Sequence, residues 1–411
     1  KMNHNLNVPL LSSFLQGVLT AIGITICCGL YAQAPVKKLQ VYAAPAGVPL
    51  AEEYQLFAKE KTSTQWQQVP LYLQQSPIDS QVSACYTILA MQGPVDFRVD
   101  VLRKSVRSST IRPKVFGVQA LQRGQSLFFT LPRPMKVSVE LNDNDRDAIL
   151  IFASGPAVFP ADTAGKQVVR FGPGLHHIGH RYPLKSNTIY WLDGGAYLSG
   201  SFYAAGSTQG IIIGGHGVVD AGYQVWQHPL KGLLCNVQFE DAGSLVMTGI
   251  TMVNAGNFQL KIQCKTANQT IRLTNLNLIG WNHNTDGIHV SDMDWKDHPK
   301  LGNAPGTRLI IDSCFIRAND DAVLLSDGVA AAEVKNSVFW DDGGGAVFCL
   351  SWGGHQQSTS TIVQQCFVIH KKRDNPVFRA LHAGQADISN VLFENIWIEG
   401  QVSTLVGLRI G

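Results

Sequence analysis

The chain has 411 residues, of which 45% are hydrophobic and 15% are charged, and it contains 39 glycines. This composition is typical of a globular protein with a large core, in one large domain or two ordinary ones, and it excludes a disordered chain and a helical repeat protein. The formal net charge of +3, without a stripe of basic residues, gives no basis for nucleic-acid binding.

The first predicted element is an apolar segment, Leu10 to Leu30, that is almost free of charge and is followed by Ala32-Gln33-Ala34. A small-x-small pattern after such a segment is a cleavage signal, so residues 1–34 are predicted to be a secretory signal peptide. A retained membrane anchor is the alternative, because about 20 apolar residues can span a bilayer. We expect a secreted or periplasmic protein without stable membrane insertion. A lysine precedes the first methionine and the chain stops abruptly, so we also expect a fragment with a truncated C-terminus.

The segment 35–165 is predicted to be an N-terminal β-sandwich domain. Short stretches in which apolar and polar residues alternate, such as Phe97 to Val101 and Lys136 to Leu141, are separated by turn-rich sequence. This spacing favours an immunoglobulin-like sandwich. No chemistry-bearing residues gather there, so we expect a packing or carbohydrate-binding accessory.

A loose repeat follows in residues 166–411. Six segments of similar pattern begin at Thr248, Thr274, Asp312, Lys335, Gln364 and Ser389, with intervals of 26, 38, 23, 29 and 25 residues. Such a period indicates a solenoid or a propeller, and each unit contributes too few strands for a propeller blade. Asparagine often stands second in the unit, which predicts a bend of a right-handed parallel β-helix. The third positions should then point inward and stack: Ile250, Leu276, Cys314, Ser337, Cys366 and Val391. The long interval holds an insertion, Asp292 to Thr307, which we expect to be a loop beside the functional face.

Six cysteines follow the leader: Cys85, Cys235, Cys264, Cys314, Cys349 and Cys366. Export permits disulfides, but six cysteines in a chain of this length do not make a disulfide scaffold. There is no C-x-x-C pair, so neither a structural zinc site nor a cofactor is predicted. Most of the cysteines are expected to fill core positions as small hydrophobes.

Two polar motifs, Asn284-Thr285-Asp286-Gly287 and Asn319-Asp320-Asp321, follow strands of successive units. Adjacent coils lie about 4.8 Å apart, so the three carboxylates can share one groove. Crowding of the anions raises at least one pKa and leaves a protonated acid. An acid and a base about 6.5–9.5 Å apart hydrolyse a glycosidic bond with inversion. The alternative is that these are ordinary turn carboxylates.

Both motifs resemble the signature of the β-helical glycoside hydrolases of family 28, the polygalacturonases, and family 49, the dextranases and isopullulanases. The resemblance covers residues 165 to 400. It implies that Asp320 is the general acid and that Asp286 and Asp321 are the bases that activate water.

Departures from the family 28 pattern bear on the substrate. The Gly-His-Gly segment of polygalacturonases is replaced by Gly343-Gly344-Gly345-Ala346, and their Arg-Ile-Lys by Arg379-Ala380-Leu381. A site for an anionic sugar holds cations at its centre, so the missing lysine weakens the pectin interpretation. Family 49 is similar in its sandwich before the β-helix and in a tryptophan-bearing segment, here at Trp352. Neutral sugars stack on aromatic rings.

The resulting hypothesis is a secreted inverting glycoside hydrolase with an Asp triad, acting on a polysaccharide, most simply a neutral α-glucan of the dextran type, as a monomer. The alternatives are a polygalacturonase-like pectin hydrolase, a polysaccharide lyase, and a non-catalytic β-helical adhesin or carbohydrate-binding protein. The substrate-binding candidates are Trp281, His283, Asn284, His289, Trp352 and Arg379, each with a structural role as its alternative.

Overall fold

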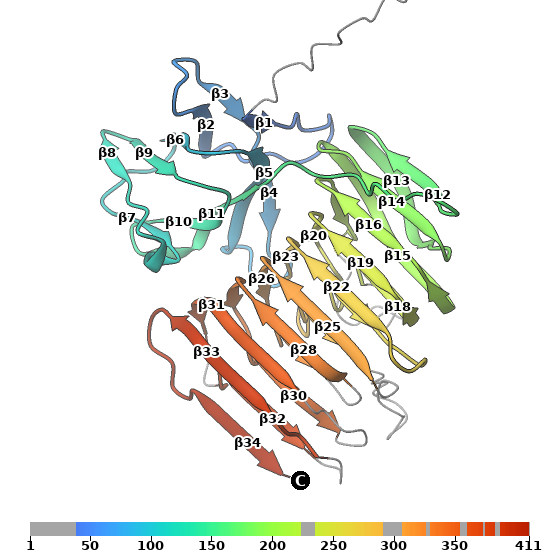
Figure 1. Ribbon diagram of the computed structural model, residues 1–411. Coiled ribbons are helices and arrows are strands. Elements are labelled where there is room, and N and C mark those ends of the chain that lie inside the picture. Colours follow the sequence, from blue (N-terminus) through green and yellow to red (C-terminus); the bar gives the residue numbers. More distant parts are fainter. Residues whose placement is uncertain are drawn as a thin grey trace, which may run out of the picture. The chain divides into compact units, whose positions relative to one another are not determined.

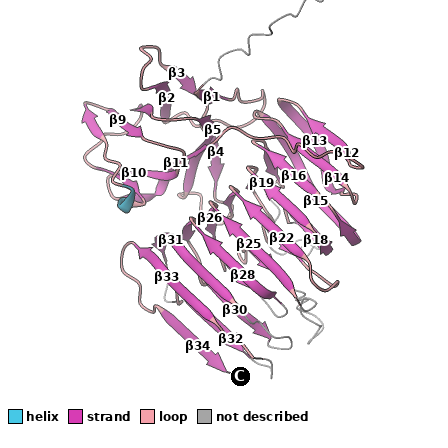
Figure 2. Cartoon of the chain, in the orientation of Figure 1, coloured by secondary structure: helices cyan, strands magenta, loops and turns pink. Residues whose placement is uncertain are grey.

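The computed structural model describes residues 38–222, 235–290, 306–325, 329–353, 360–372, 375–382 and 387–410, with the backbone alone at 351–353 and 410. These residues form almost only strands, and η1 (Lys114–Phe116) is a short 3-10 helix (Figure 2). No helix among them is long and apolar enough to cross a membrane. The predicted signal peptide and most of the insertion after Asp292 lie outside the described residues.

The first eleven strands build two sheets, of six and five strands. The six-stranded sheet contains β1 (Leu39–Val41), β4 (Tyr72–Gln75), β5 (Ser83–Met91), β7 (Ser109–Arg112), β10 (Lys136–Leu141) and β11 (Asn144–Ser154). The five-stranded sheet contains β2 (Tyr54–Glu60), β3 (Gln67–Val69), β6 (Val95–Val101), β8 (Leu121–Arg123) and β9 (Ser126–Leu131). Buried residues from both sheets, among them Leu56, Phe97 and Val139, form one core.

The remaining strands form a 23-stranded parallel sheet that coils on itself. In Figure 1 its strands are stacked in chain order from green to red. They are β12 (Gln167–Phe171), β13 (Gly174–Pro183), β14 (Thr188–Leu192), β15 (Ala196–Gln209), β16 (Ile212–Gly215), β17 (Val218–Asp220), β18 (Val237–Gly243), β19 (Leu245–Thr248), β20 (Thr251–Val253), β21 (Leu260–Ile262), β22 (Thr270–Thr274), β23 (Asn277–Ile279), β24 (Ile288–Val290), β25 (Thr307–Asp312), β26 (Phe315–Ala318), β27 (Val323–Leu325), β28 (Val329–Lys335), β29 (Val338–Asp341), β30 (Phe348–Gly353), β31 (Thr361–Lys371), β32 (Phe378–His382), β33 (Val391–Ile398) and β34 (Val406–Ile410).

Each central coil contributes three strands, and each of these pairs in parallel with the strand three further along, as β22 pairs with β25 and β25 with β28. At both ends of the β-helix the partner is two strands further along, as for β12 with β14 and β32 with β34. This is a parallel β-helix, and the predicted all-β fold class with a preceding sandwich is confirmed. The sandwich strands end at Ser154 and the β-helix begins at Gln167. Residues 37 to 411 together form one compact unit.

The bends between the first and second strands of successive coils have left-handed backbone conformations. Their φ values are positive at Gly249, Asn275, Ser313, Asn336 and Gln365. Glycine and asparagine adopt this conformation most readily, which explains the repeat found in the sequence. The five inward positions that follow are fully buried, as predicted: Ile250, Leu276, Cys314, Ser337 and Cys366.

The prediction that Val391 is the sixth inward-pointing residue is wrong. Val391 pairs with Thr361 and is 36% exposed, whereas Ile396 pairs with Cys366 and takes the expected place in the stack. Asn390 and Asn395 both have positive φ values. The sequence therefore offered two equivalent bend residues, and the register of β33 with β31 selects the second.

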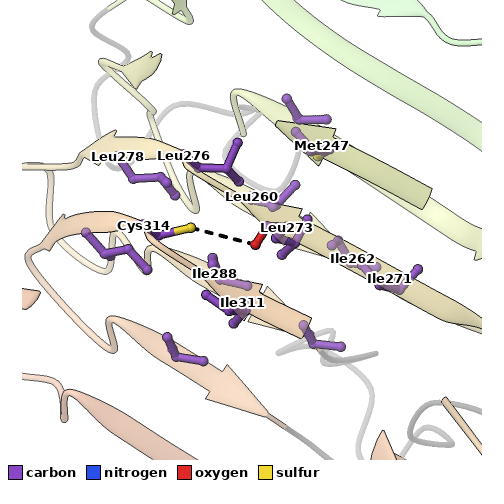
Figure 3. Packing of buried hydrophobic residues seen from close by; sticks show 14 of the residues in the cluster. Met247, Leu260, Ile262, Ile271, Leu273, Leu276, Leu278, Ile288, Ile311 and Cys314 are labelled. Atoms are coloured by element: carbon purple, nitrogen blue, oxygen red, sulfur yellow. Dashed lines mark hydrogen bonds between the residues drawn. The ribbon is translucent and has the colours of Figure 1, made fainter. Parts of the chain in front are cut away.

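The interior of the β-helix is a column of aliphatic side chains. Figure 3 shows Leu273 of one coil beside Ile311 of the next, with the thiol of Cys314 pointing at the Leu273 carbonyl oxygen. The distance from Cys314 Sγ to that oxygen is 3.8 Å. The six cysteines after residue 34 are all buried. This confirms their predicted role as small core residues.

One sheet of the sandwich packs against the β-helix. In β10, Val137 and Val139 point into the sandwich core, while Lys136 and Glu140 point to the other side and contact the β-helix. Glu140 accepts hydrogen bonds from His370 Nε2 at 2.8 Å and from Arg112 Nε at 2.9 Å. Around this polar stripe an interface cluster buries apolar side chains of both parts: Tyr86 and Phe152 from the sandwich, and Ile279, Trp281, Phe315 and Trp340 from the β-helix.

Candidate active site

The register of neighbouring coils brings the two acidic motifs together. Ile288 of β24 lies opposite Val323 of β27, and the Gly287 N–H donates to the Asp321 carbonyl at 3.0 Å. Asp286 lies two residues before Ile288, and Asp321 lies two residues before Val323. The two aspartates therefore occupy equivalent places on adjacent coils. Asp320 precedes Asp321 directly, and all three carboxylates interact electrostatically. The sequence-based expectation of one shared acidic site agrees with this arrangement.

Main-chain hydrogen bonds fix the Asp320 segment against the preceding coil. The carbonyl oxygen of Thr285 accepts from the N–H groups of Asn319 at 3.1 Å and Asp320 at 3.2 Å. The Asn319 side-chain amide donates to the Asn282 carbonyl at 3.1 Å. Asn284, a predicted substrate-binding residue, has a φ of 58°. Its conformation turns the chain here, so Asn284 has at least a structural role.

The glycine run on the next coil, seen in the sequence only as a departure from the family 28 pattern, packs against the acidic segment. A Cβ atom on Gly345 would lie 2.1 Å from the carbonyl carbon of Asp320, and one on Gly343 would lie 1.6 Å from the carbonyl oxygen of Asn319. Only glycine lets this coil approach so closely. Ala346 follows, and its N–H donates to Asp321 Oδ1 at 2.6 Å. The signal was a run of three glycines one coil after the acidic pair.

A cation from the fourth coil completes the arrangement. Arg379 of β32 lies opposite Cys349 of β30, and its Nη2 donates to Asp321 Oδ1 at 2.6 Å. The side chain of Arg379 is 13% exposed and that of Asp321 only 4%. Arg379, which was predicted to bind substrate, thus contacts a carboxylate of the triad.

Burial and mutual repulsion raise the pKa of each carboxyl group. Burial, and then the negative charge of Asp321, raise the pKa of Asp320 to about 6. Burial, and then the charges of Asp321 and Asp320, raise the pKa of Asp286 well above its ordinary value. Burial also raises the pKa of Asp321, although the Arg379 guanidinium opposes this effect. The site therefore retains a proton at mildly acidic pH.

His289 supports Asp286 from within the same coil. Its Nδ1 lies 2.5 Å from Asp286 Oδ2, and its ring stacks on Phe258 with centroids 3.9 Å apart. Burial, and then the charge of Lys261, lower the pKa of His289 well below its ordinary value, so the ring is neutral. Only 3% of His289 is exposed. His289, a predicted substrate-binding residue, therefore contacts Asp286 and is almost closed to solvent, which favours the structural alternative.

Trp281, another predicted substrate-binding residue, lies in a buried position that favours its structural alternative. Its side chain is 5% exposed and belongs to the interface cluster, with the Arg317 guanidinium 4.3 Å from its ring centroid. A sugar platform needs an open ring face. His283, in contrast, is exposed next to the acidic motif. Trp352 lies in β30, where the backbone alone is described, so the position of its ring is outside the described residues.

No group of three or more His, Cys, Asp or Glu side chains that could hold a metal ion occurs among the residues that the structure describes. The arrangement that is present, three acidic groups of raised pKa beside one arginine and one main-chain N–H donor, is suited to moving protons to and from a bound ligand.

Replacing Arg379 with glutamine should lower kcat/KM and move the pH–rate profile to higher pH. The charge of Arg379 lowers the pKa of both Asp321 and Asp320, so its removal raises both. Loss of a charged hydrogen bond costs about 1.5–3 kcal/mol, which corresponds to about 10- to 100-fold in rate. Profiles of the parent and the variant, measured from pH 4 to 8 on one polysaccharide, test this. An Arg409→Gln variant is the control, and an unshifted profile for Arg379→Gln would contradict the assignment.

Comparison with known proteins gives matches in structure alone. No protein-family model matches the sequence, and no curated protein matches it. The fold is similar to that of Dex49A from Penicillium minioluteum, with a TM-score of 0.59 and 13% identity over 90% of each chain. The Family 28 exopolygalacturonase from Yersinia enterocolitica matches with a TM-score of 0.40 and 11% identity, over 77% of this chain and 89% of that one. The similarity to Dex49A confirms, at the level of the fold, the resemblance seen in the motifs.

Proposed function

We propose that this protein is an exported glycoside hydrolase that cleaves a neutral α-glucan of the dextran type with inversion of configuration. The observation that carries the proposal is the meeting of Asp286, Asp320 and Asp321 on adjacent coils, with the pKa of Asp320 raised to about 6. A carboxyl group of this kind remains protonated at mildly acidic pH and can donate a proton to a leaving oxygen.

Asp320 is the proposed general acid. It is partly exposed, whereas Asp286 and Asp321 are each only 3% exposed. Of the three carboxyl groups it therefore has the most open access to a glycosidic oxygen. The proton passes from Asp320 to that oxygen while the bond to the anomeric carbon breaks.

Asp321 and Asp286 are the proposed bases that take a proton from the attacking water. The ion pair with Arg379 and the N–H of Ala346 stabilise the charged form of Asp321. Burial and the charges of both neighbouring carboxylates raise the pKa of Asp286, so it competes with Asp320 for the proton of the site. A neutral His289 that carries its hydrogen on Nδ1 donates to Asp286 and keeps it ionised. The proton then remains on Asp320.

The preference for a neutral sugar is supported by the charges of the site. Arg379 is committed to Asp321 at 2.6 Å. The position of the Gly-His-Gly histidine is held by Gly344, between two glycines that pack against the Asn319-Asp320-Asp321 segment. A galacturonate carboxylate there would have to compete with Asp321 for the guanidinium of Arg379. The fold similarity to Dex49A is consistent with this choice.

Release of reducing sugar from a panel of dextran, pullulan and polygalacturonate tests the substrate. We expect hydrolysis of dextran. Inversion converts the α-glycosidic bond into a product whose new reducing end is the β-anomer, and NMR detects that anomer. Faster cleavage of polygalacturonate than of dextran would overturn the neutral-sugar preference. Retention of the anomeric configuration would overturn the mechanism. Sensitivity of the parent to a chelator would favour a lyase instead.

The rate should depend on pH as the pKa of Asp320 requires. Because that pKa is about 6 and the acid must be protonated, kcat/KM should fall as the pH rises through about 6. The measurement is kcat/KM against pH with the substrate below its KM, since this reports the groups of the free enzyme. A rate that stays constant from pH 5 to pH 8 would remove Asp320 from the role of acid.

A further inference from the structure

A cavity of about 560 Å³ lies at the junction of the sandwich and the β-helix, away from the acidic triad. The bend residues Asn275, Ser313 and Asn336 of three successive coils line one side, and Lys136 and Ser154 of the sandwich line the other. These bends join the first and second strands of each coil, whereas the carboxylates stand between the second and third. The junction cavity shares no lining residue with the triad, and its volume falls within the usual range for ligand sites.

The lining offers hydrogen-bond donors and acceptors in alternation. Asp312 Oδ1 accepts from Ser313 Oγ at 2.8 Å and from Asn336 Nδ2 at 2.9 Å. On the facing side, Ser154 Oγ donates to Asn275 Oδ1 at 3.0 Å. A hydroxyl group both donates and accepts, so a surface that mixes amides, hydroxyls and a carboxylate fits a polyhydroxylated ligand.

Lys136 adds a buried donor to the junction cavity. Its Nζ donates to the Leu276 carbonyl oxygen at 2.8 Å, the only hydrogen bond recorded for it within the described residues. An ammonium group has three donors, so it can reach further acceptors in the cavity. Burial lowers the pKa of Lys136 to about 7.

Aromatic rings form the apolar part of the wall. Phe116 and Phe367 meet edge to face with centroids 4.8 Å apart, and both line the cavity. Phe367 also stacks on Trp397, with centroids 5.1 Å apart and the planes inclined by 19°. Trp397 is 40% exposed, so the aromatic group continues from the cavity to the surface. Sugar rings present C–H faces that pack on such side chains.

We propose that the junction cavity is a second carbohydrate-binding site, which takes a short segment of a neutral polysaccharide and holds the polymer apart from the catalytic carboxylates. One carboxylate, Asp312, and one guanidinium, Arg133, line the cavity and offset each other, and burial lowers the pKa of Lys136, so the lining favours a neutral ligand over a charged one. The identity of that sugar as an α-glucan rests on the proposed function, but the existence of the site does not.

Affinity electrophoresis in gels that contain dextran tests the proposal, with an Asp320→Asn background to prevent hydrolysis. Two variants are added: Lys136→Met, which removes the ammonium group, and Asn336→Gly, which removes an amide and keeps the left-handed bend. Each should raise the apparent Kd for dextran about tenfold, the loss expected for one charged or well-aligned hydrogen bond. Asn395→Gly is the matched control, because it changes an equivalent bend outside the cavity.

The outcomes separate this inference from the proposed function. An unchanged Kd in Asn336→Gly, with an unchanged melting temperature, overturns the second site and leaves hydrolysis of dextran unaffected. If pullulan rather than dextran retards the parent, and both variants lose that retardation, the site stands and the dextran assignment fails. Retardation by polygalacturonate that both variants lose overturns the neutral-ligand proposal. In an active background, both variants should cleave isomaltotriose at the parental rate and show a raised KM for polymeric dextran.

Discussion

An Asp320→Asn protein is expected to fold as the parent does and to hydrolyse polysaccharide about 10² to 10⁴ times more slowly, the usual contribution of a general acid. Asparagine keeps the size of the side chain and the hydrogen bond from the Asp320 N–H to Thr285, but it cannot supply the proton. The measurement is kcat on dextran at pH 5. Asp387→Asn, a change at an exposed carboxylate, serves as the control.

The same substitution makes a second, independent prediction about stability. The pKa of Asp320 is raised from its ordinary value of 3.8 to about 6 in the folded protein, so the unfolded chain releases this proton at a lower pH than the folded protein does. The contribution of Asp320 to the free energy of unfolding is therefore lost as the pH rises through about 6. An uncharged asparagine avoids that loss. The variant should therefore melt no lower than the parent at pH 7. Parental activity in the variant would show that another group is the acid.

Gly345→Ala should abolish most activity although it adds a single methyl group. The new Cβ atom would lie 2.1 Å from the carbonyl carbon of Asp320 and 2.2 Å from the nitrogen of Asp321. Both are backbone atoms, so one coil must move relative to the other and displace two carboxylates. A misplacement of about 1 Å at a catalytic group can cost about 10² in rate. We expect at least that loss in kcat/KM, together with a lower melting temperature.

Gly172→Ala is the matched control for this prediction. An added Cβ atom there has no neighbour within 4 Å, and Gly172 does not have a positive φ. The Gly172→Ala variant should retain the activity and the melting temperature of the parent. If Gly345→Ala also retained full activity, the close contact between the glycine run and the acidic segment would not be needed for catalysis.

Much of the β-helix follows from the sequence, because its bends require residues that tolerate a left-handed conformation. Asn275, Ser313 and Asn336 mark successive coils and fix the inward positions after them. The last coil was misplaced because Asn390 and Asn395 both meet that requirement. Only the pairing of β33 with β31 distinguishes them.

The sequence predicts the parts of the candidate site that follow from two motifs on neighbouring coils. It does not predict the parts that follow from how side chains pack. Asp286, Asp320 and Asp321 follow from the motifs. The role of His289 beside Asp286 and the N–H of Ala346 beside Asp321 depend on side-chain direction and coil register, which spacing does not give. Trp281 was assigned to the substrate because the sequence does not show that the sandwich sheet covers its position.

The acidic site draws its groups from four consecutive coils: Asp286 from the first, Asp320 and Asp321 from the second, Ala346 from the third and Arg379 from the fourth. Its geometry is therefore set by the stacking of the coils, and the segments that leave the stack are free to vary in length. Exchange of such segments between β-helical proteins should thus alter which polymer is admitted while the reacting groups stay in place.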